Sequence, residues 1–95
     1  MKNSGNKSWN IRYKKSVAKD IKKLSRPAQK IIQQVIEEKI RVDPMYFGTP
    51  LRRSLKGLFK LRVGSYRIIY SIEEKTITIY VISIAHRKDV YKKLQ

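Results

Sequence analysis

Three cations lie close together in the sequence on either side of a short turn, and together they could bind a phosphate group. Lys60 and Arg62 precede Gly64-Ser65, and Arg67 follows it. Guanidinium groups bind phosphate through two parallel hydrogen bonds, and their charge favours a transition state in which the phosphoryl group gains negative charge. These residue types therefore suit phosphate chemistry.

The stretch from Leu58 to Tyr70, which reads LFKLRVGSYRIIY, predicts a β-hairpin that positions these cations. Gly64-Ser65 suits a two-residue reversal, and the flanking residues alternate in polarity as half-buried strands do. Side chains then alternate between two faces. The predicted core face carries Phe59, Leu61, Val63, Tyr66, Ile68 and Tyr70, and the cationic face carries Lys60, Arg62, Arg67 and Ile69.

This register places Arg62 directly opposite Arg67 on the cationic face. Like charges opposite each other on neighbouring strands destabilise a sheet by a few tenths of a kcal/mol. An anion bound between the two guanidinium groups would account for the pair. The alternative is that both arginines extend into solvent beside the turn, where dissolved salt screens their repulsion.

The whole chain is strongly basic. Its 95 residues, enough for one domain with a single core, include 23 Lys plus Arg against 7 Asp plus Glu, which gives a net charge of +16. Such a charge attracts phosphates, so a polyanionic partner is expected. No apolar run reaches the roughly 18 residues that span a bilayer, and the start MKNSGNK lacks the apolar stretch of a signal peptide. We therefore expect a cytoplasmic protein without a membrane partner.

Most familiar catalytic and metal-binding arrangements are missing from the sequence. It has no cysteine and a single histidine, His86, so we predict no metal site, and no motif predicts a cofactor. The adjacent carboxylates Glu37-Glu38 and Glu73-Glu74 are assigned to a solvated helix end and to a turn. What remains is a set of Lys, Arg, Tyr and His side chains near the C-terminal strands.

The beginning of the chain predicts a loose end followed by a strand. Residues 1–7 are polar and without periodicity, so we expect them to be disordered, with residues 8–95 forming one domain. Within that domain, Trp9, Ile11 and Tyr13 alternate with polar residues, which is typical of a half-buried strand.

Helical spacing of apolar residues predicts two helices after that strand. The first lies within SVAKDIKKL, with Ser16 available as its N-cap. The second begins at Ser25, has Pro27 in its first turn and runs to about Val42. Asp43-Pro44 ends it, because the residue before a proline is pushed out of the α region.

A loop and a third strand are predicted around the hairpin. The segment from Pro44 to Lys56 is expected to lack regular structure, because it contains prolines and a glycine. After the hairpin, the run TITIYVISIA from Thr76 to Ala85 predicts a strand that a two-residue turn at Glu74-Lys75 joins to the hairpin. The remaining HRKDVYKKLQ is expected to be a short tail or one helical turn.

The predicted register of this third strand follows from its turn. Pairing Ile72 with Ile77 and Tyr70 with Ile79 makes the apolar patterns of all three strands agree. The core face then receives Ile77, Ile79 and Val81, and the cationic face receives Thr78, Tyr80 and Ile82. The order β-α-α-β-β-β predicts an α+β domain with a four-stranded, mostly antiparallel sheet and its helix pair on one face.

The succession LKG, LFKLRVGSYRIIYSI and ITIYVISIAHRKDVY, preceded by a strand and a helix pair, resembles the RelE/ParE superfamily of toxins from bacterial and archaeal type II toxin–antitoxin modules. The resemblance extends from about Trp9 to Tyr91. It implies a RelE/ParE-like fold. RelE-type members are ribosome-dependent endoribonucleases that cut messenger RNA with basic residues and often a tyrosine, without a metal.

The resemblance assigns functional residues one at a time. The lysine of the FKLR strand is Lys60, the arginine after the turn is Arg67, the arginine after the last strand is Arg87, and the C-terminal tyrosine is Tyr91. A further family lysine falls on Leu58, and its contribution is missing or comes from Lys56 or Arg62. The short interval between Arg87 and Tyr91 is like that of archaeal members.

These positions imply roles in the family's reaction. Arg67 and Arg87 would bind the phosphate, Lys60 would stabilise charge or abstract a proton, and Tyr91 would stack on a base or donate a proton. His86 could be an acid or base, since histidine titrates near neutrality, or it could simply cap the last strand. The predicted RNA contacts are Lys56, Arg62, Arg53 and Lys88.

The resemblance therefore implies a messenger RNA endoribonuclease that inhibits translation. Its expected partners are a cognate antitoxin, the ribosome and messenger RNA, with no small-molecule cofactor. Two alternatives remain: a ParE-like inhibitor of DNA gyrase without nuclease activity, and an inactive RNA-binding relative.

Overall fold

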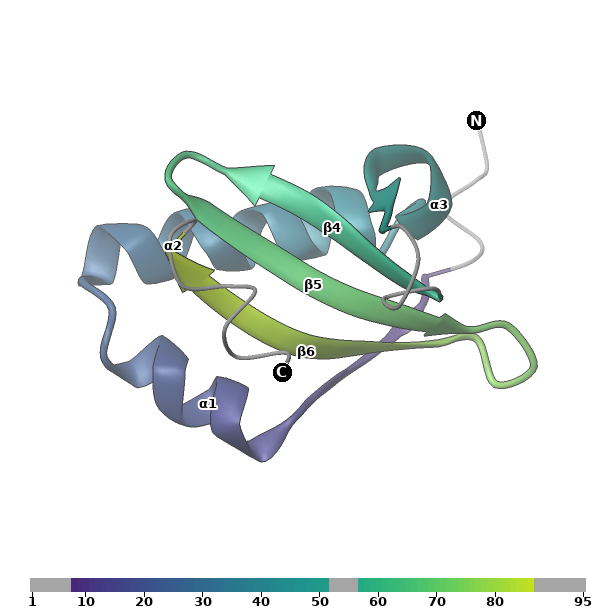
Figure 1. Cartoon of the computed structure of the whole chain (residues 1–95), viewed down its shortest axis with the longest axis horizontal. Helices are drawn as coiled ribbons and strands as arrows, with labels where there is room; N and C mark the ends of the chain where they lie inside the picture. The colour runs from purple at the N-terminus through teal and green to yellow at the C-terminus, as the bar shows by residue number, and fades with distance from the viewer. Residues whose placement is uncertain (1–7, 52–56, 87–95) are drawn as a thin grey trace.

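A computed structural model of the chain describes residues 8–51 and 57–86. Figure 1 shows a curved sheet with helices packed behind it. The predicted disordered end, residues 1–7, and the C-terminal tail after His86 lie outside the described residues. In order, the elements are β2 (Asn10–Tyr13), α1 (Lys15–Lys22), α2 (Arg26–Val35), the π-helical turn η1 (Ile36–Ile40), α3 (Pro44–Phe47), β3 (Thr49–Pro50), β4 (Leu58–Val63), β5 (Tyr66–Glu73) and β6 (Thr78–His86).

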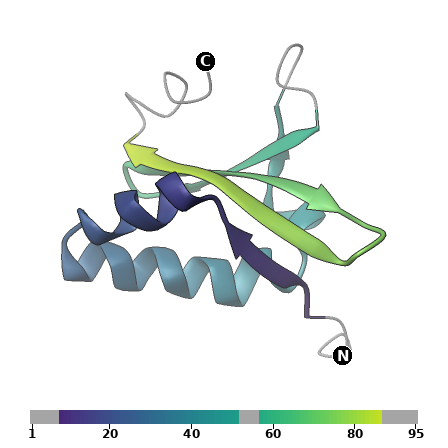
Figure 2. The ribbon, with the colours of Figure 1, turned by 90° about the horizontal axis from the view of Figure 1, so that it is seen from below.

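The strands form one five-stranded sheet in the order β2-β6-β5-β4-β3. Only the pair between β2 and β6 is parallel among these strands, and the other three pairs are antiparallel. Helices α1 and α2 lie together on one face of the sheet (Figure 2). The predicted α+β class is confirmed, with one strand more than expected. No helix in the described ranges is long and apolar enough to cross a bilayer.

The core lies between the sheet and the helices. Its buried residues come from both layers and include Val17, Ile32, Ile36, Ile40, Val63, Ile68, Tyr70, Ile79, Val81 and Ile84. We call this side of the sheet the core face and the other side the open face. The open face has no described helix over it (Figure 2).

The predicted hairpin between β4 and β5 is confirmed. Val63 pairs with Tyr66, Arg62 with Arg67, and the register continues to Leu58 and Ser71. Gly64 adopts a φ of 60°, a left-handed conformation that glycine takes without a steric penalty. The two-residue turn therefore fixes which side chains of both strands reach the open face.

The predicted start and register of β6 are wrong. The strand begins at Thr78 rather than Thr76, and Tyr70 pairs with Val81 instead of Ile79. The turn contains four residues, Glu74 to Ile77, and Ile77 is exposed with a φ of 50°. Because two extra turn residues shift the pairing by an even number, Val81 still reaches the core, whereas Ile77 does not.

A β-bulge at Ile82 then changes which residues of β6 face the core. Tyr70 pairs with Val81 but Ile69 pairs with Ser83, so Ile82 has no partner in the register. The extra residue inverts the alternation beyond it. Ile84 therefore packs in the core, and Ser83 lies on the open face.

The predicted loop after Asp43 contains two short elements. Asp43 Oδ1 accepts a hydrogen bond from the Tyr46 backbone nitrogen at 3.2 Å and caps α3, in which Pro44 occupies the first turn. Thr49 pairs with Lys60 as part of the edge strand β3. Proline is compatible with both positions, because neither the first turn of a helix nor the outer side of an edge strand requires a backbone N–H donor.

The helix boundaries agree with the sequence except at their ends. Ser25 Oγ accepts a hydrogen bond from the Ala28 backbone nitrogen at 3.3 Å, which confirms it as the N-cap of α2. Ser16 does not cap α1: that helix begins at Lys15, and its N-cap residue Lys14 makes no side-chain cap bond. The second helix continues through η1 and ends at Ile40, slightly earlier than predicted.

A buried tyrosine connects the sheet to α3. The Tyr70 hydroxyl donates a hydrogen bond of 2.6 Å to the Pro44 carbonyl oxygen, and its ring stacks on Phe59 with centroids 5.8 Å apart. A Cβ atom at Gly48 would overlap the Tyr70 hydroxyl. This contact thus orients the chain that leads into β3, the strand beside Lys60.

The Gly48→Ala substitution should lower the free energy of unfolding by about 1–3 kcal/mol, the usual cost of overpacking. The cost should be smaller in a Tyr70→Phe background, because the overlapping hydroxyl is absent there. Urea unfolding of the two single variants and the double variant measures this coupling. An equal cost of Gly48→Ala in both backgrounds would contradict an overlap between the added methyl group and the Tyr70 hydroxyl.

Tyr70 should make the fold sensitive to alkali. Burial, and secondarily the negative charge of Asp43, raise the pKa of the Tyr70 hydroxyl above its ordinary value. The unfolded chain loses this proton near pH 10 while the folded chain keeps it, so stability falls above about pH 10, by about 1.4 kcal/mol per pH unit. The free energy of unfolding of the wild type and of Tyr70→Phe, measured by denaturation between about pH 9 and pH 11, should fall less steeply with pH in the variant. Equal slopes in the two proteins would contradict a contribution from Tyr70.

Candidate functional site

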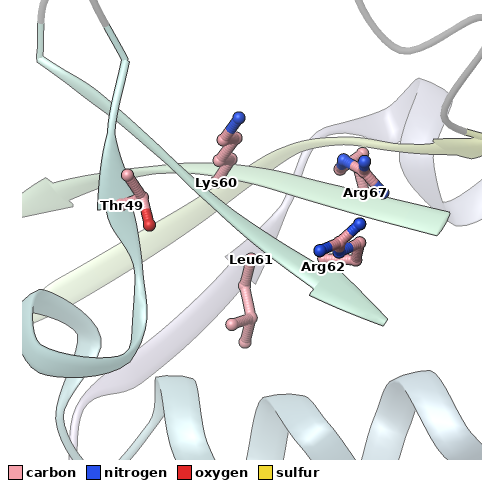
Figure 3. A pocket seen from close by; sticks show the side chains of 5 residues that line it. All are labelled: Thr49, Lys60, Leu61, Arg62 and Arg67. Carbon is pink, nitrogen blue, oxygen red and sulfur yellow. The ribbon is translucent and has the colours of Figure 1, made fainter. Parts of the chain in front are cut away.

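The predicted cations line a cleft at the hairpin end of the sheet. The cleft has a volume of about 440 Å³, and its walls are formed by Thr49, Lys60, Leu61, Arg62 and Arg67. Figure 3 shows Leu61 pointing toward the helices and Lys60 pointing away from them. The side chains of Arg62 and Arg67 lie near each other in this view. The open face therefore presents three cations to one space.

The sheet register holds these side chains in place. Arg62 and Arg67 are cross-strand partners, and Lys60 lies between Thr49 on β3 and Ile69 on β5. Lys60 and Arg67 are half-buried, while Arg62 is exposed. Thr49 was not predicted as a site residue, because its segment was assigned to a loop. The strand that contains it has only two residues, Thr49–Pro50, which is too short to show an alternating pattern in the sequence.

Carboxylates do not neutralise this cluster within the described part of the chain. The ion pair found there joins Arg41 to Glu37 at 2.8 Å, on the helical layer. Lys60, Arg62 and Arg67 have no ion-pair partner among the described residues. Because cations held close together repel each other, the cluster favours an anion that would bridge them.

Two buried polar atoms on the open face support a bound polar group. Arg67 Nη1 and Ser83 Oγ are inaccessible to solvent and lack a hydrogen-bond partner among the described residues. Their backbones are diagonal neighbours, because Ser83 pairs with Ile69 and Arg67 pairs with Ala85. An unpaired buried donor costs about 1–3 kcal/mol, so a ligand oxygen that accepts from Arg67 would stabilise the site.

A small apolar cluster lies beside the cations. Ile69 and Ala85 are buried on the open face, and Leu51 and Leu58 pack against them. Leu58 occupies the position at which the resemblance implied a lysine. Its side chain therefore contributes to apolar packing on this face, and Lys60 and Arg62 supply the cationic charge of β4.

His86 lies apart from the three cations. It pairs with Tyr66 at the end of β6, and the two rings meet edge to face with centroids 6.0 Å apart. Tyr66 packs against the core, so the pairing puts His86 on the core face. The bulge at Ile82 produces this arrangement, because it inverts the alternation of the residues that follow.

The other predicted site residues are outside the described ranges. They are Arg87, Tyr91, Lys56, Arg53 and Lys88. The structure therefore brings together Lys60, Arg62 and Arg67. No group of three or more His, Cys, Asp or Glu side chains among the described residues could hold a metal ion.

These groups can bind phosphate and stabilise negative charge that develops on it. The described cluster offers fixed positive charge from two guanidinium groups and an ammonium group. Arginine presents planar pairs of N–H donors, which match two oxygens of a phosphate. The arrangement is thus chemically suited to an anion such as a phosphate ester.

Comparison with known proteins identifies a family. Residues 11–91 match the model of the family described as ParE toxin of type II toxin-antitoxin system, parDE. Toxin RelG of Mycobacterium tuberculosis is 31% identical over 88 residues, which cover 90% of this chain and 98% of that protein. Toxin RelE of the same organism is 26% identical over 84 residues, covering 88% and 87%.

Solved structures show the same fold. The toxin–antitoxin complex RelBE2 of Mycobacterium tuberculosis contains a chain with a TM-score of 0.79 and 28% identity, covering 86% of this chain and 94% of that one. In the RelE–RelB complex of Pyrococcus horikoshii, the matching chain has a TM-score of 0.64 and 23% identity, covering 84% and 96%.

The opposed arginines should affect stability in a way that depends on salt. Replacing Arg62 by Gln removes a like-charge pair, so the free energy of unfolding should rise by about 0.2–1 kcal/mol at low ionic strength. The gain should vanish near 1 M salt, where the screening length is about 3 Å. Arg26→Gln on α2 is the matched control. If Arg62→Gln, but not Arg26→Gln, lowered the free energy of unfolding at low salt, this result would contradict a repulsion between Arg62 and Arg67.

Proposed function

Since this chain belongs to the RelE/ParE superfamily of type II toxins, we propose that it inhibits translation by cutting messenger RNA on the ribosome. The observation that carries this proposal is the cation cluster of the open face. Arg62 and Arg67 oppose each other, Lys60 lies beside them, and no described carboxylate pairs with any of the three. A phosphate of an RNA chain supplies the charge that this cluster lacks.

The proposed reaction uses a nucleophile that RNA carries itself. The 2′-oxygen of one nucleotide forms a bond to the adjacent phosphorus, and the bond from phosphorus to the 5′-oxygen of the next nucleotide breaks. The products are a 2′,3′-cyclic phosphate and a 5′-hydroxyl. The proton of the 2′-hydroxyl leaves to a base, and the 5′-oxygen receives a proton, so the step requires no redox partner.

The protein's main contribution is charge stabilisation. Arg67 and Arg62 would bind the phosphate oxygens, and Lys60 would stabilise the additional negative charge of the transition state or accept the 2′ proton. Arg87 and Tyr91 are proposed, from the family resemblance, to complete the site with a second phosphate contact and a proton donor or base-stacking ring. His86 is not assigned to this step, because it pairs with Tyr66 on the core face.

A cognate antitoxin is the proposed regulator of this activity. The two related structures described above are complexes of a toxin with its antitoxin. An acidic antitoxin would be attracted to a toxin of net charge +16 and would compete with RNA for the open face. We propose that the toxin acts in the cytoplasm, where ribosomes and antitoxin are both present.

Inhibition of DNA gyrase is the second candidate function. It is favoured by the family model, whose description names ParE. Supercoiling by purified gyrase in the presence of the toxin tests it. Inhibition there, without RNA cleavage on ribosomes, would replace the nuclease proposal.

Substitutions in the cation cluster should abolish cleavage without unfolding the protein. Lys60→Ala and Arg67→Ala should each lower the cleavage rate by about 10²–10³-fold, the usual effect of losing one charge-stabilising donor. Arg67→Ala combined with Arg87→Ala should also abolish growth inhibition. Primer extension on ribosome-bound messenger RNA measures cleavage, and circular dichroism checks the fold.

Arg26→Ala provides the matched control, since it removes the same side chain from the exposed surface of α2. It should keep the wild-type rate. Equal losses in Arg26→Ala and Arg67→Ala would mean that net charge alone determines the activity. Full toxicity of the double variant would contradict the proposal.

A further inference from the structure

A second exposed feature of the open face is an aromatic ring without a described partner. Tyr80 lies on β6, an inner strand of the sheet, and 45% of its surface is exposed. Its neighbours in the register are Ser71 on β5 and Arg12 on β2. Within the described ranges, the Tyr80 ring and hydroxyl make neither a ring contact nor a hydrogen bond. An exposed ring on a basic sheet surface can stack on a nucleobase.

Arg12 supplies a cation next to that ring. It pairs with Tyr80 in the parallel register, so both side chains lie on the open face, while the adjacent Ile11 packs against the core. Arg12 is exposed and forms no ion pair among the described residues. Tyrosine and arginine side by side offer one surface for a base and one charge for its phosphate.

The position of Tyr80 relative to the cation cluster suits one continuous strand of RNA. Lys60 pairs with Ile69, so Ser71 is its diagonal neighbour on β5, about 7–8 Å away. Tyr80 lies directly opposite Ser71, a further 5 Å or so. A single strand of roughly four nucleotides, the length that a small single-strand binding fold covers, is thus long enough to contact both Lys60 and Tyr80.

The carboxylate of Glu73 limits the direction of this path. Glu73 pairs with Thr78 beyond Tyr80, so it faces the same side of the sheet, and Glu74 follows in the turn. Negative charge there repels a phosphate backbone. A strand that passes Tyr80 therefore turns toward Arg12 at the β2 edge rather than continuing to the turn.

We infer that Tyr80 and Arg12 form a nucleobase-stacking subsite for a nucleotide near the phosphate bound by Lys60, Arg62 and Arg67. The ligand is an unpaired nucleotide of single-stranded RNA. Tyr80 stacks on its base, and Arg12 binds an adjoining phosphate. The inference rests on the proposed function, because it takes RNA as the substrate of the cation cluster.

The test is an abasic scan with an RNA that cannot be cleaved. A short 2′-O-methyl RNA lacks the attacking hydroxyl, and one abasic residue is moved through it one position at a time. Binding to the full-length toxin is measured by fluorescence anisotropy at low ionic strength, because salt weakens phosphate contacts. The wild type should lose about tenfold in affinity at one position, the size of one base–aromatic stack.

Variants of Tyr80 assign that position. Tyr80→Ala should bind the intact RNA about tenfold more weakly, and the abasic residue should then have no further effect at the sensitive position. Tyr80→Phe should behave as the wild type, because the ring suffices for stacking. Tyr46→Ala is the matched control, since Tyr46 on α3 is 76% exposed and the substitution removes the same atoms.

Several outcomes would overturn the inference. These are a flat abasic scan with the wild type, an unchanged scan with Tyr80→Ala, and an equal loss for Tyr80→Phe and Tyr80→Ala. The cleavage proposal fails separately, if the wild type leaves ribosome-bound messenger RNA intact. Because the RNA of the scan cannot be cut, its result reports base stacking whether or not the toxin is a nuclease.

Discussion

The two-residue turn at Gly64-Ser65 is the constraint on which the site depends. It sets the register of β4 and β5. A slip of one residue would exchange the two faces of a strand, moving Lys60 and Arg62 into the core and Leu61 into solvent. The apolar core therefore fixes the position of the cations, because burying the apolar side chain of Leu61 is favourable whereas burying the charged side chain of Lys60 is costly.

This coupling explains how the fold tolerates an unfavourable arrangement of charge. The repulsion between Arg62 and Arg67 is a matter of tenths of a kcal/mol, whereas each large apolar side chain buried on the other face contributes about 1.5–3 kcal/mol. The core thus easily maintains the opposed arginines without a ligand. A phosphate between them would meet donors that the sheet already positions.

Local pattern was sufficient to predict the hairpin, its faces and the pairing of Arg62 with Arg67. The helix cap at Ser25 was also evident, because a serine before a proline and an apolar repeat is a specific combination. The pattern failed where tertiary pairing decides structure. Thr49-Pro50 forms a strand only because β4 offers an edge, and no short-range signal distinguishes that from a loop.

The end of β6 shows a second kind of limit. Apolar residues occupy consecutive positions from Ile79 to Ile82, so periodicity cannot reveal whether one residue is skipped in the pairing. The bulge at Ile82 therefore escaped prediction, and with it the face on which His86 lies. The resemblance to a family implied a role for Arg67, and the chemistry of histidine suggested one for His86, but neither could indicate that the two residues are on opposite faces.

The bulge also determines how much room Arg67 has. Without the extra residue, the alternation of β6 would continue unbroken, and Ile84 would lie opposite Arg67 in place of Ala85. A branched butyl side chain there would occupy volume that is now open beside the guanidinium group. One inserted residue thus places two small side chains, Ser83 and Ala85, on the open face near Arg67. The room beside Arg67 is, in this sense, set by the number of residues in β6 as well as by their types.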